Sequence, residues 1–137
     1  MRKIEYRRNI IPSAEAVRSL YEDAGWVGYI SDMPRLMDAI RQSLFIITAW
    51  DDGKLAGFIR IVGDGLTIIY IQDLLVLRAY KRNNIGSTLV RMVCEEYHNV
   101  RQKVLLTDDT VETRAFYESL GFHSCDKGDL VSFVKMG

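Results

Sequence analysis

Residues 73–89 constrain the fold more than any other stretch of this sequence. Their first part is apolar and typical of a buried strand, a basic turn follows, and a helix with one apolar face begins near Gly86. This order brings free backbone N–H groups and the positive end of a helix dipole to one place, which favours an anion. The stretch therefore predicts a strand–turn–helix unit that can hold a phosphate group.

β-rich runs before this unit predict an N-terminal strand and an antiparallel meander. The expected strands are Lys3–Arg8, Leu44–Trp50, Lys54–Val62 and Leu66–Leu77, with a further short strand at Lys103–Thr107. Asp52-Gly53 and Asp64-Gly65 separate the runs of the meander, and Asp-Gly between apolar runs is a strong hairpin signal because Gly accepts a positive φ. The helix between the last two strands predicts a right-handed parallel crossover.

Apolar residues at helical spacing predict four helices around this sheet. They are expected to begin after Ser13, at Asp32, at Ile85 and after Asp109, and to end at Gly25, Ser43, Tyr97 and Gly121. Ser13 is a candidate N-cap, and Asp109 with Glu112 reads as a capping box. Gly25–Tyr29 is predicted as an aromatic loop, and His123–Asp126 with Leu130–Lys135 as a final hairpin. The expected fold class is α/β with a mixed α+β sheet.

Length and composition favour a single soluble domain over residues 1–137. The chain is 48% hydrophobic, and its 18 Lys and Arg balance its 18 Asp and Glu, so no overall field favours nucleic acid or an anionic membrane as partner. The N-terminus has no secretory signal, and the apolar runs are too short to span a bilayer. Two cysteines form no disulfide framework, which suggests a cytoplasmic location.

The basic turn is the first candidate for chemistry. Its expected anion-binding residues are Lys81, Arg82, Asn83, Asn84, Ile85, Gly86 and Ser87. Gly lets the backbone approach a ligand closely, and Asn tolerates left-handed conformations better than most other residues. The alternative is a solvated basic turn that merely leads into a helix.

This turn resembles the acyl-CoA-binding motif of the GNAT superfamily of N-acetyltransferases, Arg/Gln-x-x-Gly-x-Gly/Ala. Lys81 stands at its first position, Asn84 at its first glycine and Gly86 at its last position. A second segment, residues 110–122, is similar to the family's late helix, Asn-x-x-Ala-x-x-Phe-Tyr-x-x-x-Gly-Phe. Thr110 and Thr113 depart from its Asn and Ala, while Tyr117 falls on the tyrosine that commonly acts as general acid.

The resemblance implies a GNAT fold and acetyl-CoA as the acyl-donor co-substrate. In the family the pantetheine arm pairs with the strand before the phosphate turn, which corresponds to Leu74, Leu75 and Val76. An irregularity of that strand would free an amide to polarise the thioester carbonyl. The acceptor amine must also lose a proton, and Asp73 is the first candidate base. The alternatives for Asp73 are that it satisfies backbone groups at a strand irregularity or points to solvent.

Trp26 and Tyr29 are candidates for the acceptor site, because aromatic faces bind cationic amines. The alternative for this segment is a hydrophobic plug over the sheet. Asp108 could attract the same amine, and no metal site is expected. The sequence thus predicts transfer of acetyl to a primary amine of a small molecule or peptide, by direct attack in a ternary complex. A CoA-binding module without turnover and a protein–protein interaction domain stay open as alternatives. The resemblance also allows a homodimer, which is common in the family.

Overall fold

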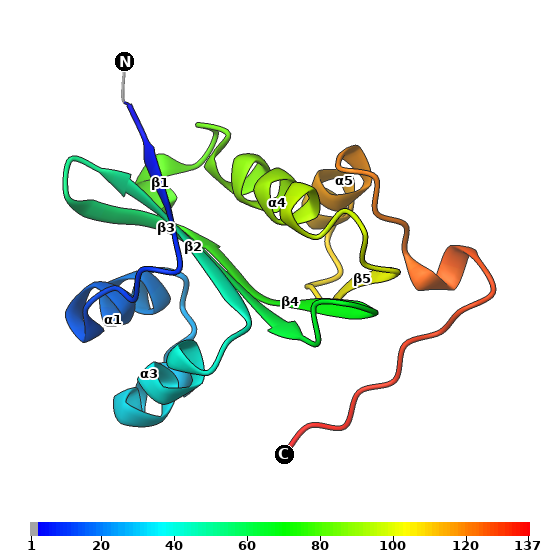
Figure 1. Cartoon of the computed structure of the whole chain (residues 1–137), viewed down its shortest axis with the longest axis horizontal. Coiled ribbons are helices and arrows are strands. Elements are labelled where there is room, and N and C mark those ends of the chain that lie inside the picture. Colours follow the sequence, from blue (N-terminus) through cyan, green and yellow to red (C-terminus); the bar gives the residue numbers. More distant parts are fainter. Residues whose placement is uncertain (1–2) are drawn as a thin grey trace. The chain divides into compact units, whose positions relative to one another are not determined.

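The computed structural model describes residues 3–137 and contains a five-stranded sheet with helices packed on it (Figure 1). In chain order the elements are β1 Glu5–Arg8, α1 Ala14–Asp23, α2 Val27–Ile30, α3 Met33–Arg41, β2 Phe45–Asp51, β3 Lys54–Gly63, β4 Ile68–Val76, the 3₁₀ helix η1 Arg78–Tyr80, α4 Ile85–Glu96, β5 Gln102–Leu105, α5 Val111–Ser119 and the 3₁₀ helix η2 Cys125–Lys127. The chain divides into two compact units, one ending at Leu106 and the other spanning Thr107–Gly137. The prediction of a single domain stays a prediction.

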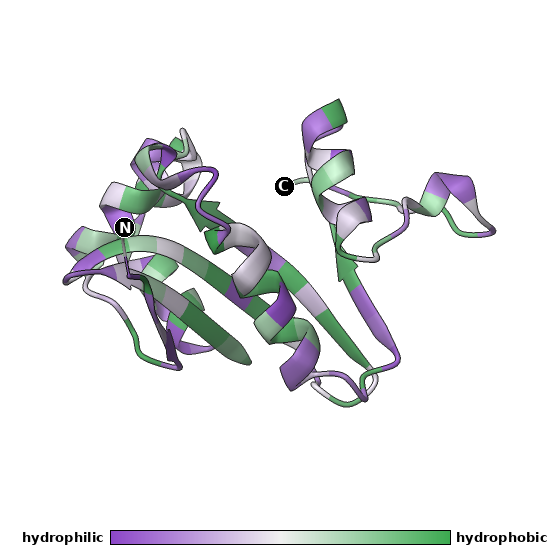
Figure 2. Ribbon diagram, turned by 90° about the horizontal axis from the view of Figure 1, so that it is seen from above, coloured by the Kyte–Doolittle hydropathy of each residue, from purple (hydrophilic) through white to green (hydrophobic). Residues whose placement is uncertain are grey.

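The first unit contains the whole sheet, in the order β1-β2-β3-β4-β5. The pairs from β1 to β4 are antiparallel, and β4 pairs with β5 in parallel, so the predicted meander and parallel crossover are confirmed. The central strands consist mostly of hydrophobic residues (Figure 2). Helix α1 packs on β3 and β4, and α4 packs on β2, β3 and β4 from the opposite face (Figure 1). The strands β3 and β4 therefore lie between helix α1 on one face of the sheet and helix α4 on the other.

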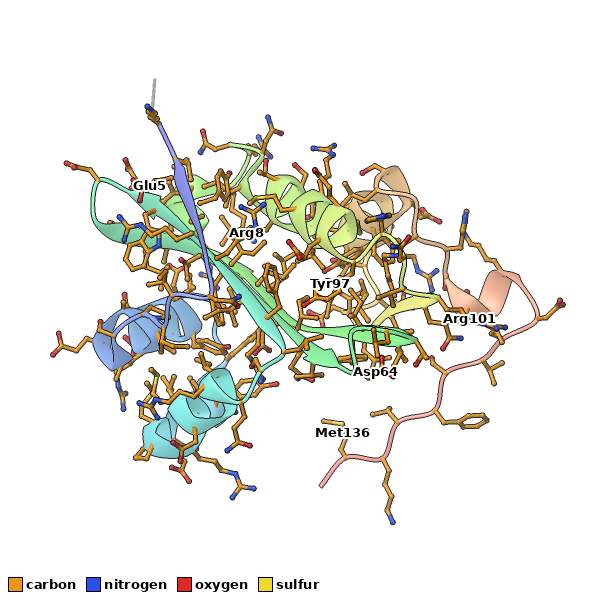
Figure 3. The ribbon with its side chains drawn as sticks, viewed as in Figure 1. Glu5, Arg8, Asp64, Tyr97, Arg101 and Met136 are labelled. Carbon is orange, nitrogen blue, oxygen red and sulfur yellow. The ribbon has the colours of Figure 1, made fainter. Side chains whose placement is uncertain are left out.

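Local sequence signals explain most of the element boundaries. The Ser13 side chain accepts a hydrogen bond from the Ala16 N–H and caps α1 as predicted. Asp52 and Gly53 both have positive φ, 47° and 84°, which is the geometry of a type I′ hairpin turn. At the β3–β4 turn, Asp64 Oδ1 accepts hydrogen bonds from the N–H groups of Leu66, Thr67 and Ile68 (Asp64 is labelled in Figure 3).

One segment predicted as a loop is helical. Residues Val27–Ile30 form the short helix α2 inside the predicted loop Gly25–Tyr29, so residues 3–137 contain five α-helices where four were expected. The aromatic rings of Trp26 and Tyr29 pack against Tyr21 of α1, with ring centroids 6.0 and 5.5 Å away. Packing on α1 thus outweighs the low helix propensity of Gly28.

The predicted final hairpin is wrong. Residues 123–137 contain the helix η2, a turn after it and otherwise no regular secondary structure, with no strand pairing. Local turn bonds, from Lys127 N–H to Ser124 O and from Gly128 N–H to Cys125 O, take the place of the hairpin turn. A two-stranded hairpin on its own is marginal in water, so these local bonds prevail. The apolar side chains beyond Asp129 are exposed, among them Phe133 and Met136.

Candidate active site

The strand that carries the predicted thioester site has an irregularity at Gln72. Arg60 of β3 faces Asp73, while the next residue, Ile61, faces Ile71, so Gln72 is an extra residue in β4. The resemblance called for an irregularity in the strand segment Leu74–Val76, and in the structure the irregularity lies just before that segment, at Gln72. A bulge of this kind leaves backbone groups out of the regular ladder.

Beyond the bulge, β4 and β5 no longer pair. The parallel register joins Ile68–Ile71 to Gln102–Leu105 and stops there. Within residues 3–137, Asp73–Val76 therefore pair with β3 on one side, and the whole stretch Gln72–Val76 has no strand partner on its other edge. Leu74, Leu75 and Val76, the residues predicted to pair with pantetheine, all lie on this open edge.

The basic turn after β4 has the backbone geometry that an anion site needs. Arg82 and Asn84 have positive φ, 69° and 60°, and Asn84 is the left-handed residue directly before α4. The Asn84 side chain makes no capping bond, and in the described part of the chain no acceptor meets the N–H groups of residues 85–87. These donors, together with the exposed Lys81 and Arg82, surround the start of the helix.

Further contacts hold the turn in place. The Asn83 side-chain amide donates to the Tyr80 carbonyl at 3.0 Å, and the Tyr80 hydroxyl donates to Asp51. Gly57 of β3 lies so close to α4 that a Cβ there would come within 2.8 Å of Ile85 Cγ2. The absence of a side chain at Gly57 thus lets the first residue of α4 pack directly on the sheet.

Asp73 lies in a buried network with two partners that the sequence analysis missed. Its Oδ2 accepts a hydrogen bond from Arg60 Nε at 2.7 Å and another from the Tyr21 hydroxyl at 2.7 Å. The side chain of Asp73 is fully buried and that of Arg60 is 8% exposed, while Asp73 Oδ1 is buried without a partner in the described chain. The one sequence signal for this network was Arg60, a single charged residue in the otherwise apolar part of β3.

This network shifts the ionisation of both partners. Burial, and next the adjacent Asp73 carboxylate, raise the pKa of Tyr21 far above its usual range. Burial alone would lower the pKa of Arg60, but Asp73 and, to a smaller extent, Tyr21 together outweigh burial, so the pKa is raised. At neutral pH the phenol is therefore neutral and the guanidinium is charged.

An aromatic cluster covers this network on the α1 side. The Tyr21 ring contacts Trp26, Tyr29 and Phe58, and the Tyr29 hydroxyl accepts a hydrogen bond from the Gln72 side-chain amide at 3.3 Å. Trp26 and Tyr29 remain 36% and 39% exposed. A cavity of about 250 Å³ adjoins the cluster, lined by Gly28, Tyr29, Asp32, Arg35, Leu36, Ala39 and Arg60.

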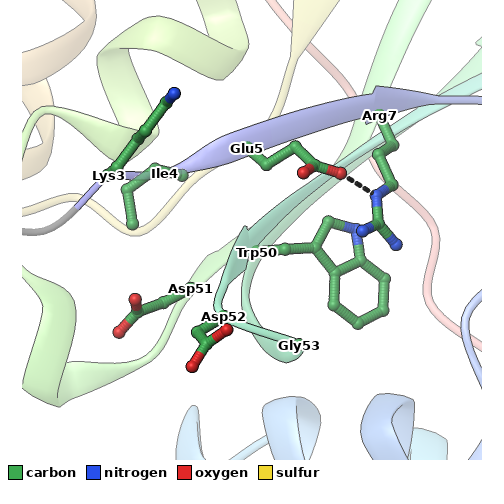
Figure 4. A pocket seen from close by; sticks show the side chains of 8 residues that line it. All are labelled: Lys3, Ile4, Glu5, Arg7, Trp50, Asp51, Asp52 and Gly53. Carbon is green, nitrogen blue, oxygen red and sulfur yellow. Dashed lines mark hydrogen bonds and ion pairs between the residues drawn. The ribbon is translucent and has the colours of Figure 1, made fainter.

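A second hollow, of about 870 Å³, contains none of the predicted site residues. It is lined by Lys3, Ile4, Glu5, Arg7, Trp50, Asp51, Asp52 and Gly53 (Figure 4). Arg7 lies over the Trp50 ring, with its guanidinium carbon 5.0 Å from the ring centroid, and it also pairs with Glu5. The hollow shares only Asp51 with the contacts that hold the turn in place.

The second unit carries the remaining predicted residues. Burial raises the pKa of Tyr117 to about 12, and its ring makes edge contacts with Phe116 and Phe122. The prediction that Asp109 caps this helix, α5, is wrong. The N-cap is Thr110, whose hydroxyl accepts a hydrogen bond from the Thr113 N–H, while Asp109 forms an ion pair with Arg114. The threonine starts the helix in extended conformation, which leaves the aspartate free for the ion pair. Asp108 is exposed.

Comparison with known proteins identifies the family. The model of the acetyltransferase (GNAT) domain matches residues 12–136. The chain belongs to the GNAT acetyltransferase family. No curated protein matches the sequence. A GNAT-family acetyltransferase from Streptococcus pneumoniae TIGR4 is 32% identical to this GNAT chain, with 98% of both chains covered and a TM-score of 0.88.

More distant GNAT structures share the fold at lower identity. An aminoglycoside N-acetyltransferase in complex with CoA is 18% identical, with 99% of this chain and 96% of that chain covered and a TM-score of 0.76. Ribosomal-protein-alanine N-acetyltransferase from Brucella melitensis biovar Abortus 2308 is 16% identical, with 98% of this chain and 99% of that chain covered and a TM-score of 0.72. No helix in residues 3–137 of this GNAT chain is long and apolar enough to cross a membrane.

Proposed function

We propose that this GNAT domain transfers the acetyl group of acetyl-CoA to a primary amine by direct attack in a ternary complex. One observation carries the proposal. The open edge of β4, Gln72–Val76, runs through η1 into a turn whose left-handed Asn84 leaves three N–H groups of α4 without acceptors. Acetyl-CoA has an extended chain with amide groups followed by a diphosphate. The amide chain can pair with the β4 edge, and the diphosphate can bind at the turn before α4.

Binding of acetyl-CoA would use backbone groups for most of its contacts. The amides of the pantetheine arm pair with the main chain of Leu74, Leu75 and Val76. The diphosphate accepts hydrogen bonds from N–H groups in residues 82–87 at the positive end of the α4 dipole. Lys81 and Arg82 add positive charge at the rim. A fit of this kind needs no particular side chain at Asn84, only its left-handed backbone.

The chemistry is an aminolysis of the thioester. The ammonium of the acceptor first loses a proton to solvent water, and its nitrogen then attacks the carbonyl carbon, forming the C–N bond. A backbone N–H at the Gln72 bulge stabilises the oxyanion of the tetrahedral intermediate. Collapse breaks the C–S bond, and the nitrogen gives its second proton to solvent water. On the family resemblance, the thiolate receives a proton from Tyr117, whose phenolate then regains a proton from solvent water. With its pKa raised to about 12, Tyr117 is protonated at neutral pH, as a proton donor must be.

The alternative is a GNAT module that binds CoA without turnover. One observation favours it: Asp73, the first candidate base in the sequence, is already engaged by Arg60 and Tyr21. A protein that only senses CoA needs the β4 edge and the turn but no base. Binding and catalysis must therefore be measured separately.

Calorimetric titration with acetyl-CoA tests the binding step. We expect saturable heat for the wild type and a loss of affinity for Gly86→Val, because a β-branched side chain would keep the phosphate from the backbone. Gly128→Val is the matched control, since a Cβ at Gly128 meets nothing within 4 Å and its φ is negative. Wild-type protein that gives no heat with acetyl-CoA would refute both functions.

Release of free thiol then separates the enzyme from the sensor. The amine panel should contain kanamycin, spermidine and a peptide with N-terminal alanine, because GNAT structures named for aminoglycoside and ribosomal-protein-alanine acetylation share this fold. Thiol release with any of these supports the enzyme, and binding of acetyl-CoA without release throughout the panel supports the sensor. Trp26, Tyr29 and Asp108 stay proposed acceptor residues, and a cytoplasmic homodimer stays a prediction from the sequence.

A further inference from the structure

Five residues form a continuous chain of contacts around the β4 bulge. Arg60 bonds Asp73, Asp73 bonds Tyr21, the Tyr21 ring packs on Tyr29, and Tyr29 bonds Gln72, which neighbours Asp73 in β4. We propose that Tyr21 is a positioning residue of the acceptor site, which places Tyr29 relative to the reacting edge of β4. This inference rests on the proposed acetyltransferase function.

The Tyr21 hydroxyl fixes the position of its ring. The side chain is fully buried, so its hydroxyl must find a partner within the protein, and Asp73 Oδ2 at 2.7 Å supplies it. A hydrogen bond to a charged carboxylate is stronger than one between neutral groups. The carboxylate in turn is held by Arg60, which faces it in the register of β3 and β4. The ring of Tyr21 is thereby anchored to the two central strands.

The Tyr21 ring in turn supports the exposed aromatic residues. Tyr29 and Trp26 lie against it at centroid distances of 5.5 and 6.0 Å, and against each other at 6.0 Å. Helix α2, which carries Tyr29, has four residues and no side-chain cap, so it depends on such packing. Any movement of the Tyr21 ring would therefore shift Tyr29.

The same residues shape the cavity beside the bulge. Tyr29 and Arg60 are both part of its lining, and both belong to the network around Asp73. With about 250 Å³, the cavity has room for the end of a small amine. Tyr29 joins this cavity to the bulge, because its ring is part of the lining while its hydroxyl accepts a hydrogen bond from the Gln72 amide. The network thus couples the walls of an acceptor cavity to the strand that would hold the thioester.

Asp73 accordingly acts through Tyr21 and Arg60 and not as the base. Both of its side-chain partners donate to one oxygen, Oδ2, and the whole carboxylate is closed off from solvent. A base for the acceptor amine would have to reach the substrate or a water in contact with it. The structure therefore fits a carboxylate that orients its neighbours.

The test compares Tyr21→Phe with Tyr97→Phe. The first removes the hydroxyl that bonds Asp73, and the second removes the hydroxyl of a tyrosine that packs on Phe45 away from the network. With the most active amine among kanamycin, spermidine and the alanine-terminated peptide, we expect Tyr21→Phe to raise the KM for the amine about tenfold while the Kd for CoA changes less than about twofold. Tyr97→Phe should leave both constants as in the wild type.

Fluorescence gives a second readout that needs no turnover. The chain has two tryptophans, so a Trp50→Phe background reports Trp26 alone. If Tyr21 holds the cluster, Tyr21→Phe in this background makes Trp26 more accessible to quenching by acrylamide, and Tyr97→Phe does not. Tyr29→Phe, which removes only the exposed bond to Gln72, should raise the KM for the amine less than Tyr21→Phe and keep the protein folded.

The outcomes separate the two proposals. If Tyr21→Phe changes neither the KM for the amine nor the quenching of Trp26, the positioning role is overturned. A change in the Kd for CoA as large as the change in the KM for the amine overturns it as well. If Tyr21→Phe does not fold, an unchanged KM for the amine in Tyr29→Phe overturns it equally. Wild-type protein that binds acetyl-CoA but never releases thiol refutes the transfer reaction, and the quenching result then decides the role of Tyr21 alone.

Discussion

Arg60 and Asp73 face each other across β3 and β4 and form an ion pair with Nε 2.7 Å from Oδ2. Both side chains are buried, on strands that otherwise carry apolar residues inward. Removing one partner of a buried pair leaves an uncompensated charge, which typically costs about 3–5 kcal/mol. The pair is therefore expected to dominate the response of the sheet centre to mutation.

We expect Arg60→Met and Asp73→Leu each to lower the free energy of unfolding by about 3–5 kcal/mol. The double variant should lose less than the sum of the two, because neither charge is then left alone. Urea unfolding of the four proteins of this cycle measures the coupling. Additive losses would mean that the ion pair contributes no interaction energy of its own.

Gly57 is expected to tolerate no side chain while Ile85 keeps its position. Gly57→Val should destabilise the fold by about 1–3 kcal/mol, because its Cβ would lie 2.8 Å from Ile85 Cγ2 and push α4 off the sheet. Since α4 carries the unbonded N–H groups, the affinity for CoA should also fall. Calorimetry and urea unfolding measure both effects. Combining the change with Ile85→Ala should recover part of the affinity, and a failure to recover would place the damage elsewhere.

Asn84 should be replaceable by Gly but not by Val. Its φ of 60° suits Gly without strain, whereas a left-handed β-branched residue costs on the order of 1–2 kcal/mol. Asn84→Gly is expected to bind CoA at least as tightly as the wild type, and Asn84→Val more weakly. Asn99→Val is the control, because Asn99 is exposed and does not have a positive φ. Equal affinity of all three variants would contradict the role of the left-handed turn.

Tyr117→Phe tests the proposed proton donor. Loss of a general acid typically lowers turnover by a factor of about 100 or more, and we expect this size of effect on thiol release with unchanged affinity for acetyl-CoA. The ring itself, which packs on Phe116 and Phe122, is kept in the variant. A turnover equal to that of the wild type would exclude this phenol as the acid.

Asp64 should make the fold sensitive to acid. The hydrogen bonds that it accepts, first from the Thr67 hydroxyl and then from three backbone N–H groups, hold its pKa far below the usual range. Because the folded-state pKa is the lower one, this contribution is complete above the unfolded value near 4 and is lost as pH falls below it. Thermal unfolding between pH 5 and about 2 should show a steeper loss for the wild type than for Asp64→Asn. Parallel curves would contradict the assignment.

The sequence was most informative where the structure depends on neighbouring residues. Ser13 caps α1, the Asp52-Gly53 turn has two positive φ values, and Asn84 adopts the left-handed conformation that allows it to replace a glycine. Each of these depends on a residue's own backbone preference. The Asp-Gly turn predicted the meander, and Asn84 fitted the predicted anion-binding turn. The parallel crossover was predicted from the helix between the last two strands.

Features that depend on pairing between distant residues could not be predicted. The contact of Tyr21 with Asp73 joins residues 52 positions apart, and it exists only because α1 packs over β4 in one register. The bulge at Gln72 likewise follows from how β3 meets β4. The predicted C-terminal hairpin failed for the converse reason, because the β propensity of Leu130–Lys135 cannot by itself supply a partner strand.

The open stretch of β4 has a consequence for how proteins of this kind can diverge. Main-chain donors and acceptors are the same whichever side chains they carry, so mutation at Leu74 or Val76 alters packing yet leaves the hydrogen-bonding groups intact. Proline is the exception, because it deletes a donor. Ligand recognition by backbone peptide groups therefore tolerates extensive change in the amino-acid sequence, and relatives with few identical residues can preserve it.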